Sequence, residues 1–260
     1  MTFYNLVLLG DPVRQSPSPA MHQAALADLG LDGVYRARRV VATGVEQAAA
    51  EVRTGELNGA NITMPHKALA ARLCDIVEPS AAAAGSVNTW LLSNGKLVGH
   101  STDIEAIRVC CRILPEDAPV VILGAGGAAR AALVGLADRV LGVSARRADA
   151  ACELAGHHSV ATIPWGTIPT GCLVVNATPL GMGAEELSAA VLDGARGFFD
   201  MAYGPQPTAA VKAAWERRIP TVQGLDMLVE QAALSFWLWT GCIPSRLVMR
   251  EAAESSQALN

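Results

Sequence analysis

Short apolar runs alternate along this chain with alanine-rich stretches that have helical spacing. The apolar runs read NLVLLG, VYRARRV, GANITM, PVVILGAG, RVLGVSA, CLVVNATP and GFFDMAY. Buried strands that alternate with helices form parallel sheets whose faces the helices cover. The alternation therefore predicts an α/β fold and argues against a helix bundle or a β-sandwich.

A change of pattern near residue 103 indicates a domain boundary. The helical run DIEAIRVCCRIL ends in PEDAP, and the strand VVILG then begins afresh. A chain of 260 residues is long enough for two domains that each bury a core. The last helical run, LDMLVEQAALSFWLWTG, is the most aromatic segment, so we expect it to pack between the domains or to return to the first. The predicted divisions are residues 1–103, 104–236 and 237–260.

Composition narrows the class of protein. Apolar residues make up 51% of the chain, yet no apolar stretch reaches the roughly 20 residues of a spanning helix, and the start MTFYNLVLLGD lacks the features of a signal peptide.

The cysteines and histidines do not form a metal-binding pattern. The six cysteines show no Cys-x-x-Cys pair, and His66, His100 and the pair His157–His158 lack a third ligand at a sensible spacing, so no metal is expected. A formal charge of −4 without a basic block gives no footprint for nucleic acid or an anionic membrane. We expect a cytoplasmic protein that acts on a small molecule.

A glycine-rich turn indicates a nucleotide site. In VVILGAGGAARAAL, Gly124, Gly126 and Ala129 form the pattern G-x-G-x-x-A between a strand and a helix. Gly124 allows the tight turn, Gly126 lets the backbone approach a pyrophosphate, and Ala129 lets the helix pack closely on the strand. The helix N-terminus then faces the anion. The pattern predicts dinucleotide binding, although a tight strand-to-helix turn alone would show it too.

The end of the next strand bears on the choice of cofactor. An NAD site usually places an acid there to hold the ribose hydroxyls, but LGVSARRADA places Arg146 and Arg147 at this point. A guanidinium fork suits a 2′-phosphate. We therefore predict NADP, and Asp149 nearby keeps NAD open as an alternative.

Polar residues in the first domain gather at the ends of extended runs. Lys67 lies where GANITM passes through a proline into a helical run, Asn88 and Asp103 end later runs, and Ser16 and Ser18 flank a proline-fixed turn. Each has an ordinary structural explanation, such as an ST-turn, a helix cap or a solvated lysine. Together they supply hydroxyl and amide groups, one base and one carboxylate at positions where α/β proteins build sites.

The ordered set SPSPAMH, NITMPHK, SVNTW, STD, GAGGAA, NATPLGM, DMAYGPQPT and GLDMLVEQ resembles the shikimate dehydrogenase family, from about residue 10 to residue 242. The resemblance implies an N-terminal α/β substrate domain, a C-terminal Rossmann dinucleotide-binding domain, and a last helix that packs back on the first domain. It also implies NADP-dependent, reversible reduction of 3-dehydroshikimate to shikimate, a step of the chorismate pathway to the aromatic amino acids.

The resemblance further implies roles for single residues. Lys67 would be the catalytic acid/base and Asp103 its partner, because oxidation of a secondary alcohol requires removal of the hydroxyl proton as hydride leaves. Ser16, Ser18 and Tyr203 would bind the substrate carboxylate. The ring hydroxyls would be held by Thr63, Asn88, Asp103 and Gln231. The cofactor would contact Gly124, Ala125, Gly126, Gly127, Ala128, Ala145, Arg146, Arg147, Thr178, Met201 and Gly224.

Two departures from the family's pattern leave alternatives open. Ser101 stands where the family usually has asparagine, which affects the expected substrate preference, and Ala145 also replaces an asparagine, which affects the cofactor preference. One alternative is a quinate or aminoshikimate dehydrogenase that uses NAD or NADP. Another is a dinucleotide-binding regulator without turnover. The sequence is compatible with a monomer or a homodimer.

Overall fold

The computed structural model describes residues 2–258 of the chain. They form two compact units, of which the first contains the residues up to Asp103 and those from Val229 onward, and the second contains Ile104–Leu228. The chain passes from one unit to the other inside two helices, α5 (Thr102–Cys111) and α9 (Gly224–Thr240). The second unit ends before the boundary expected at residue 236, because the later part of α9 makes its hydrogen bonds within the first unit.

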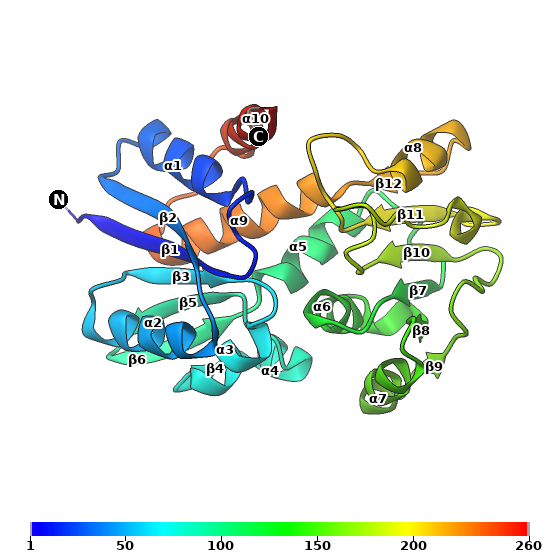
Figure 1. Ribbon diagram of the computed structural model, residues 1–260, viewed down its shortest axis with the longest axis horizontal. Coiled ribbons are helices and arrows are strands. Elements are labelled where there is room, and N and C mark those ends of the chain that lie inside the picture. The colour runs from blue at the N-terminus through cyan, green and yellow to red at the C-terminus, as the bar shows by residue number, and fades with distance from the viewer. Residues whose placement is uncertain (1, 259–260) are drawn as a thin grey trace. The chain divides into compact units, whose positions relative to one another are not determined.

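The first unit is built on a mixed six-stranded sheet in the order β2-β1-β3-β5-β6-β4 (Figure 1). β1 pairs in parallel with β2 and β3, whereas β5 runs antiparallel to β3 and β6. β4 is parallel to β6. The strands are β1 (Tyr4–Gly10), β2 (Gly33–Arg39), β3 (Gly59–Ile62), β4 (Ile76–Val77), β5 (Thr89–Ser93) and β6 (Lys96–His100).

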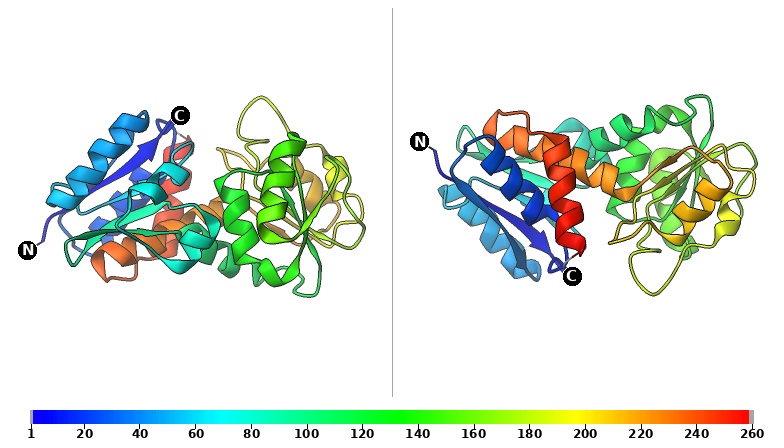
Figure 2. Two further views of the ribbon diagram at one scale, coloured as in Figure 1. Left: turned by 90° about the horizontal axis from the view of Figure 1, so that it is seen from below. Right: turned by 90° about the horizontal axis from the view of Figure 1, so that it is seen from above.

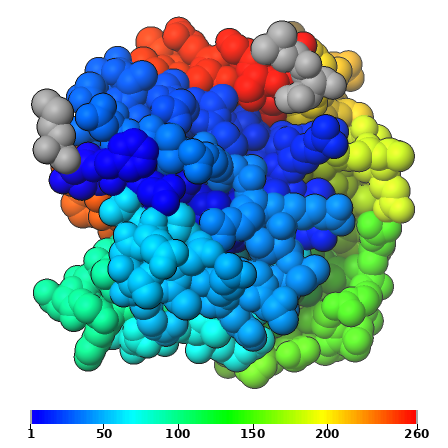
Figure 3. All heavy atoms as spheres, turned by 60° about the vertical axis from the view of Figure 1, so that its left-hand side comes forward, coloured from blue at the N-terminus to red at the C-terminus, as the bar shows by residue number. Residues whose placement is uncertain are grey.

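Helices cover both faces of this sheet because β1, which pairs with a strand on each side, carries apolar residues on both faces. Val7 and Leu9 of β1 pack into the core beside α2, whereas Leu6 and Leu8 pack on the opposite face with Tyr35. α10 packs against α1, and the red C-terminal surface lies directly against blue N-terminal residues in the space-filling view (Figures 2 and 3). The remaining helices are α1 (Ser18–Asp28), α2 (Ala42–Thr54), α3 (Lys67–Leu73), α4 (Pro79–Ala84) and α10 (Arg246–Ala258).

The second unit contains an all-parallel sheet in the order β12-β11-β10-β7-β8-β9. Counted from its own first strand this is the strand order of a Rossmann fold, read from the opposite edge. The strands are β7 (Val120–Leu123), β8 (Val140–Ser144), β9 (Ala161–Thr162), β10 (Leu173–Asn176), β11 (Gly197–Asp200) and β12 (Thr221–Val222). The helices are α6 (Gly127–Gly135), α7 (Ala148–His158), α8 (Ala209–Glu216) and the 3-10 turns η1 (Ala137–Arg139) and η2 (Ala189–Leu192).

Three of these strands, β7, β10 and β11, are buried along their whole length, as expected for strands covered on both faces. Val121, Val174 and Phe198 pack with the apolar face of α8 on one side of the sheet. The predicted α/β fold, with a Rossmann domain and a last helix on the first domain, is thereby confirmed. No helix within residues 2–258 is both long enough and apolar enough to span a membrane.

Candidate active site

The polar residues of the first unit meet at one edge of its sheet. The parallel strands β1 and β3 end there, and β5, which runs antiparallel to β3, begins there. β6 ends at the same edge, because Thr89 at the start of β5 pairs with His100 at the end of β6. The segments with Ser16, Lys67, Asn88 and Asp103 therefore leave or enter the sheet on one side.

Lys67 and Asp103 form an ion pair at this edge. Lys67 is the first residue of α3, and its Nζ donates a hydrogen bond to Asp103 Oδ2 at 2.6 Å. The Asp103 side chain is only 6% exposed and the Lys67 side chain 19%, so both charges are largely withdrawn from water. Charges buried to this degree persist when they are paired and hydrogen-bonded. The backbone also holds Lys67, because its carbonyl accepts a hydrogen bond from Val87 N at 3.1 Å.

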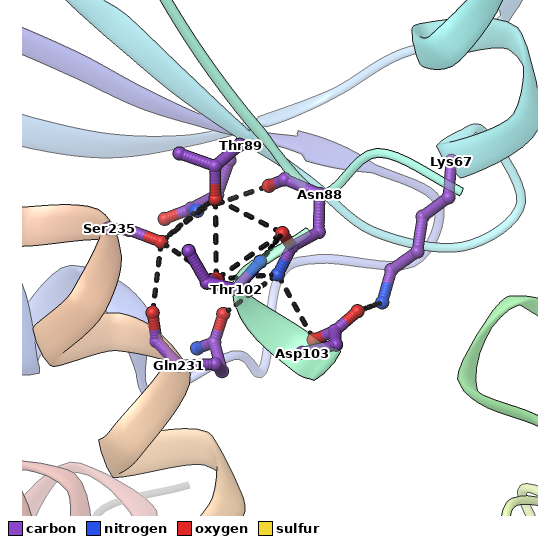
Figure 4. Close-up of polar contacts among 8 residues, drawn as sticks. Lys67, Asn88, Thr89, Thr102, Asp103, Gln231 and Ser235 are labelled. Atoms are coloured by element: carbon purple, nitrogen blue, oxygen red, sulfur yellow. Dashed lines mark hydrogen bonds and ion pairs between the residues drawn. The ribbon is translucent and has the colours of Figure 1, made fainter. Parts of the chain in front are cut away.

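Asn88 orients the other oxygen of the carboxylate (Figure 4). Its Oδ1 accepts the backbone N–H of Thr102 at 2.8 Å, which directs the Nδ2 group toward Asp103 Oδ1 at 3.0 Å. The same Nδ2 group lies 3.3 Å from Oε1 of Gln231 on α9. Asp103 thus accepts hydrogen bonds at both oxygens, one from an ammonium group and one from an amide. The structure brings together four of the predicted site residues: Lys67, Asn88, Asp103 and Gln231.

Sequence reasoning missed Asn61, Thr89 and Ser235, which lie behind this group and hydrogen-bond to one another. Asn61 Nδ2 donates to Ser235 Oγ at 2.9 Å and to Thr89 Oγ1 at 3.0 Å, and the Thr89 and Ser235 hydroxyls are 2.9 Å apart. The Ser235 hydroxyl is also 3.1 Å from that of Thr102 (Figure 4). All four side chains are buried. A buried asparagine inside the apolar strand GANI was the one available signal, because such a residue needs buried partners.

Ser16 and Ser18 lie in the segment that follows β1. Their hydroxyls hydrogen-bond to each other at 3.1 Å rather than to the Lys67 group, and Ser18 N also reaches Ser16 Oγ at 3.3 Å. Thr63 follows β3 directly, and its backbone N–H bonds to Leu9 O at 2.8 Å. These residues share the sheet edge with Lys67 and add hydroxyl groups to it.

The glycine turn of the second unit fits a dinucleotide phosphate. Gly124 has φ +111°, and a Cβ there would lie 2.9 Å from the Ala177 carbonyl oxygen, so the turn itself requires glycine. Gly126 differs, because a Cβ at this position would meet no atom of the described residues within 4 Å. It precedes α6, which no side chain in residues 2–258 caps. The open space and the amide groups of the helix N-terminus are what a pyrophosphate needs, and Ala125, Gly127 and Ala128 belong to the same turn.

The arginines predicted for the cofactor follow β8. Ala145 is half-buried, whereas Arg146 and Arg147 are exposed, and Arg147 directly precedes α7. Arg146 Nη1 forms an ion pair with Glu185 Oε2 at 2.8 Å. No pattern in the sequence indicated this partner, which lies in the loop after β10.

A buried carboxylate organises the loops after β10 and β11. Asp200 accepts hydrogen bonds from Asn176 Nδ2 at 2.8 Å, Ala202 N at 3.0 Å and Thr208 Oγ1 at 2.6 Å. Burial raises the pKa of the Asp200 carboxyl, while the hydrogen bonds from Thr208 and Asn176 act in the opposite direction. Asn176 Oδ1 in turn accepts from Thr178 Oγ1 at 2.6 Å.

This carboxylate therefore fixes segments that carry predicted site residues. They are Thr178, Met201 and Tyr203, each of which follows a strand of the second sheet. Gly224 begins α9 after β12, and a Cβ there would clash with the Ala202 carbonyl oxygen. Within residues 2–258, no three His, Cys, Asp or Glu side chains lie close enough to hold a metal ion.

A first unit with a lysine–carboxylate pair and a second, Rossmann unit with a glycine turn define a two-domain, dinucleotide-dependent oxidoreductase. Comparison with known proteins gives the family. The shikimate dehydrogenase substrate binding domain matches residues 8–90, and the shikimate 5'-dehydrogenase C-terminal domain matches residues 224–254. The chain belongs to the shikimate dehydrogenase family, which confirms the resemblance seen in its motifs.

The relatives match over almost their full length. Shikimate dehydrogenase (NADP(+)) of Desulforamulus reducens is 37% identical over 96% of this chain and 94% of its own. The crystal structure of shikimate 5-dehydrogenase from Thermus thermophilus in complex with NADP(H) and shikimate superposes with a TM-score of 0.89, at 34% identity, over 97% of this chain and 99% of its own. A ligand-free 5-ketofructose reductase of Gluconobacter has a TM-score of 0.85 at 29% identity, over 98% of this chain and 99% of its own.

Proposed function

We propose that this chain is an NADP-dependent oxidoreductase that reversibly reduces 3-dehydroshikimate to shikimate. The observation that carries the proposal is the buried Lys67–Asp103 pair, with Nζ 2.6 Å from Oδ2, at the sheet edge of the first unit. The relatives named shikimate dehydrogenase (NADP(+)) and the related structure with NADP(H) and shikimate support the substrate and the cofactor. In this role the enzyme belongs to the chorismate pathway to the aromatic amino acids.

Lys67 acts as the acid that completes the reduction. NADPH, when bound, supplies the hydride to the carbonyl carbon of the substrate. The carbonyl oxygen then gains negative charge, and the Lys67 ammonium donates one proton from Nζ to give the hydroxyl group. In the reverse direction the neutral amine takes the hydroxyl proton.

Asp103 keeps the amine in place for both directions. Its Oδ2 binds Lys67 while its Oδ1 is held by Asn88 Nδ2 at 3.0 Å, so neither group is free to rotate into solvent. Catalysis of proton transfer depends on such positioning, because the donor must lie within hydrogen-bond reach of the reacting oxygen.

The other polar groups of the first unit bind and orient the substrate. We assign the substrate carboxylate to the hydroxyl groups of Ser16 and Ser18, with Tyr203 of the second unit as a further donor. The ring hydroxyls are assigned to Thr63, Asn88 and Gln231. Hydroxyl and amide donors can satisfy these oxygens without another buried positive charge. Residues 1–103 therefore form most of the substrate domain.

The second unit binds the cofactor in this proposal. The pyrophosphate is assigned to the turn Gly124–Ala128, supported by the open space at Gly126, and the 2′-phosphate to Arg146 and Arg147 after Ala145. Thr178, Met201 and Gly224 are assigned to the nicotinamide side. We also propose a cytoplasmic location, supported by the six cysteines, all of which are free thiols. A monomer or a homodimer would suffice, because one chain supplies every assigned residue, and light scattering distinguishes the two.

A panel of initial rates tests the function. Shikimate and quinate are each supplied with NADP⁺ or NAD⁺, and reduced nicotinamide is followed by absorbance. The highest kcat/KM is expected for shikimate with NADP⁺. A higher value for quinate would assign the chain to the quinate branch of the family, and absence of turnover with all four pairs would contradict the proposal.

A further inference from the structure

One ion pair of the second unit lies where the proposed function needs an unpaired cation. Arg146 Nη1 is 2.8 Å from Glu185 Oε2, and the two side chains are 54% and 71% exposed. Arg146 follows β8, whereas Glu185 belongs to the loop between β10 and η2. The partners are therefore 39 positions apart in sequence and meet only in the folded unit.

Both side chains line the same pocket. It has a volume of about 290 Å³, and its wall includes Arg146, Trp165, Leu180, Glu185 and Glu186. The lining residues thus include an arginine and a tryptophan together with two neighbouring glutamates. The Glu185 carboxylate pairs with Arg146, whereas Glu186 takes part in no ion pair among residues 2–258.

The chemistry of the two cofactors gives this contact a consequence. NADP carries a phosphate monoester on the adenosine ribose, with about two negative charges at neutral pH, and NAD carries a hydroxyl group there. A guanidinium that binds the phosphate must release the Glu185 carboxylate or share its charge with it. NAD requires neither. Glu185 therefore weakens the binding of NADP and leaves that of NAD unaffected.

We propose that Glu185 is a specificity-determining residue that competes with the 2′-phosphate of NADP for Arg146 and so narrows the preference for NADP over NAD. This inference rests on the proposed function, in which Arg146 binds the 2′-phosphate. Both partners are exposed, so the effect is limited to what an exposed ion pair contributes, about a two- to fivefold change in affinity.

The test compares Glu185→Gln with the matched control Glu186→Gln, which removes the same charge from the same pocket. KM for NADP⁺ is expected to fall about two- to fivefold in Glu185→Gln, with KM for NAD⁺ and kcat unchanged. The gain should shrink when the salt concentration is raised, because salt screens exposed charges. An equal gain in Glu186→Gln would overturn the proposal, since it would indicate a general charge effect instead of a contact with Arg146.

A double-mutant cycle locates the effect at Arg146. In an Arg146→Ala background, Glu185→Gln is expected to leave KM for NADP⁺ unchanged, and an undiminished gain there would contradict the proposal. Calorimetry with 2′,5′-ADP and 5′-AMP measures the same competition without turnover. Glu185→Gln should tighten binding of 2′,5′-ADP alone. If the rate panel shows no turnover but Glu185→Gln binds 2′,5′-ADP more tightly, the proposed reaction is wrong and the inference about Glu185 stands. If the parent protein and Glu185→Gln bind 2′,5′-ADP equally well, the inference about Glu185 is refuted.

Discussion

His22 makes the stability of the first unit depend on pH. His22 belongs to α1, and its imidazole ring is completely buried. Neither ring nitrogen has a hydrogen-bond partner among the described residues. It stacks on Tyr35 with ring centroids 4.2 Å apart, and Phe236 and Trp239 lie at 6.2 Å and 5.4 Å. Burial lowers the pKa of His22 from 6.5 to about 3, because the charged form loses its hydration.

The direction and size of the effect follow from proton linkage. Between pH 6.5 and about 3 the unfolded chain binds a proton at His22 and the folded chain does not, so acidification favours unfolding. The contribution of His22 to stability is fully present above pH 6.5 and decreases as the pH falls. At about 1.4 kcal/mol per pH unit, the loss between pH 7 and pH 5 is about 2 kcal/mol.

Urea unfolding at pH 7, 6 and 5 measures this loss. The His22→Phe variant keeps an aromatic ring in the stack but has no group to titrate. We expect the free energy of unfolding of His22→Phe, relative to the parent protein, to rise by about 2 kcal/mol from pH 7 to pH 5. Phe236→Leu, in the same ring cluster, is the matched control and should change stability by the same amount at every pH.

Other titrating groups cancel in this comparison, because both proteins contain them. A difference between parent and His22→Phe that stays constant from pH 7 to pH 5 would refute the reasoning. An NMR titration gives a direct second test, since the ring protons of His22 should not shift over this range. Titration near pH 6.5 would show that the ring is hydrated in the folded protein.

Three further substitutions test other parts of the structure. Lys67→Met should lower kcat by about 10²- to 10⁴-fold while substrate binding changes little, and a parent-like kcat would exclude Lys67 as the proton donor. Gly126→Ala adds a methyl group to open space, so Tm should stay within a few degrees while calorimetry shows at least about tenfold weaker NADP binding; unchanged binding would place the pyrophosphate elsewhere. Thr208→Val removes the hydroxyl that caps α8 and binds Asp200, and urea unfolding should show a loss of about 1–3 kcal/mol; no loss would contradict the importance of this cap.

The fold and part of the candidate site could be predicted because they depend on local pattern. Apolar runs and helical spacing indicated the alternation of strands and helices, and Lys67, Asn88 and Asp103 were expected in loops at the ends of those runs. Asn88 lies directly before β5, whereas Lys67 begins α3 and Asp103 lies in the first turn of α5. The mixed sheet brings these residues to one edge, because β3 and β6 end there and β5 begins there.

The remainder depends on contacts between segments far apart in sequence. Ser235 meets Asn61 across 174 positions, and it lies in a helical run that reads as ordinary apolar packing. The partner of Arg146 is an acid in a loop without periodic pattern. The end of the second unit at Leu228 could not be predicted from the sequence either, because α9 continues past this residue without a proline or a second glycine.

The path of the chain sets the order in which a ribosome can release complete folding units. Residues 104–228 emerge as one uninterrupted stretch, so the Rossmann unit has all of its strands before synthesis ends. The unit that contains the earlier residues must wait for α9, whose Trp239 packs on the sheet face that holds Leu6, Leu8 and Tyr35, and for α10, which packs against α1. The half synthesised first is therefore the half completed last, and premature termination near residue 228 leaves its apolar face open to aggregation.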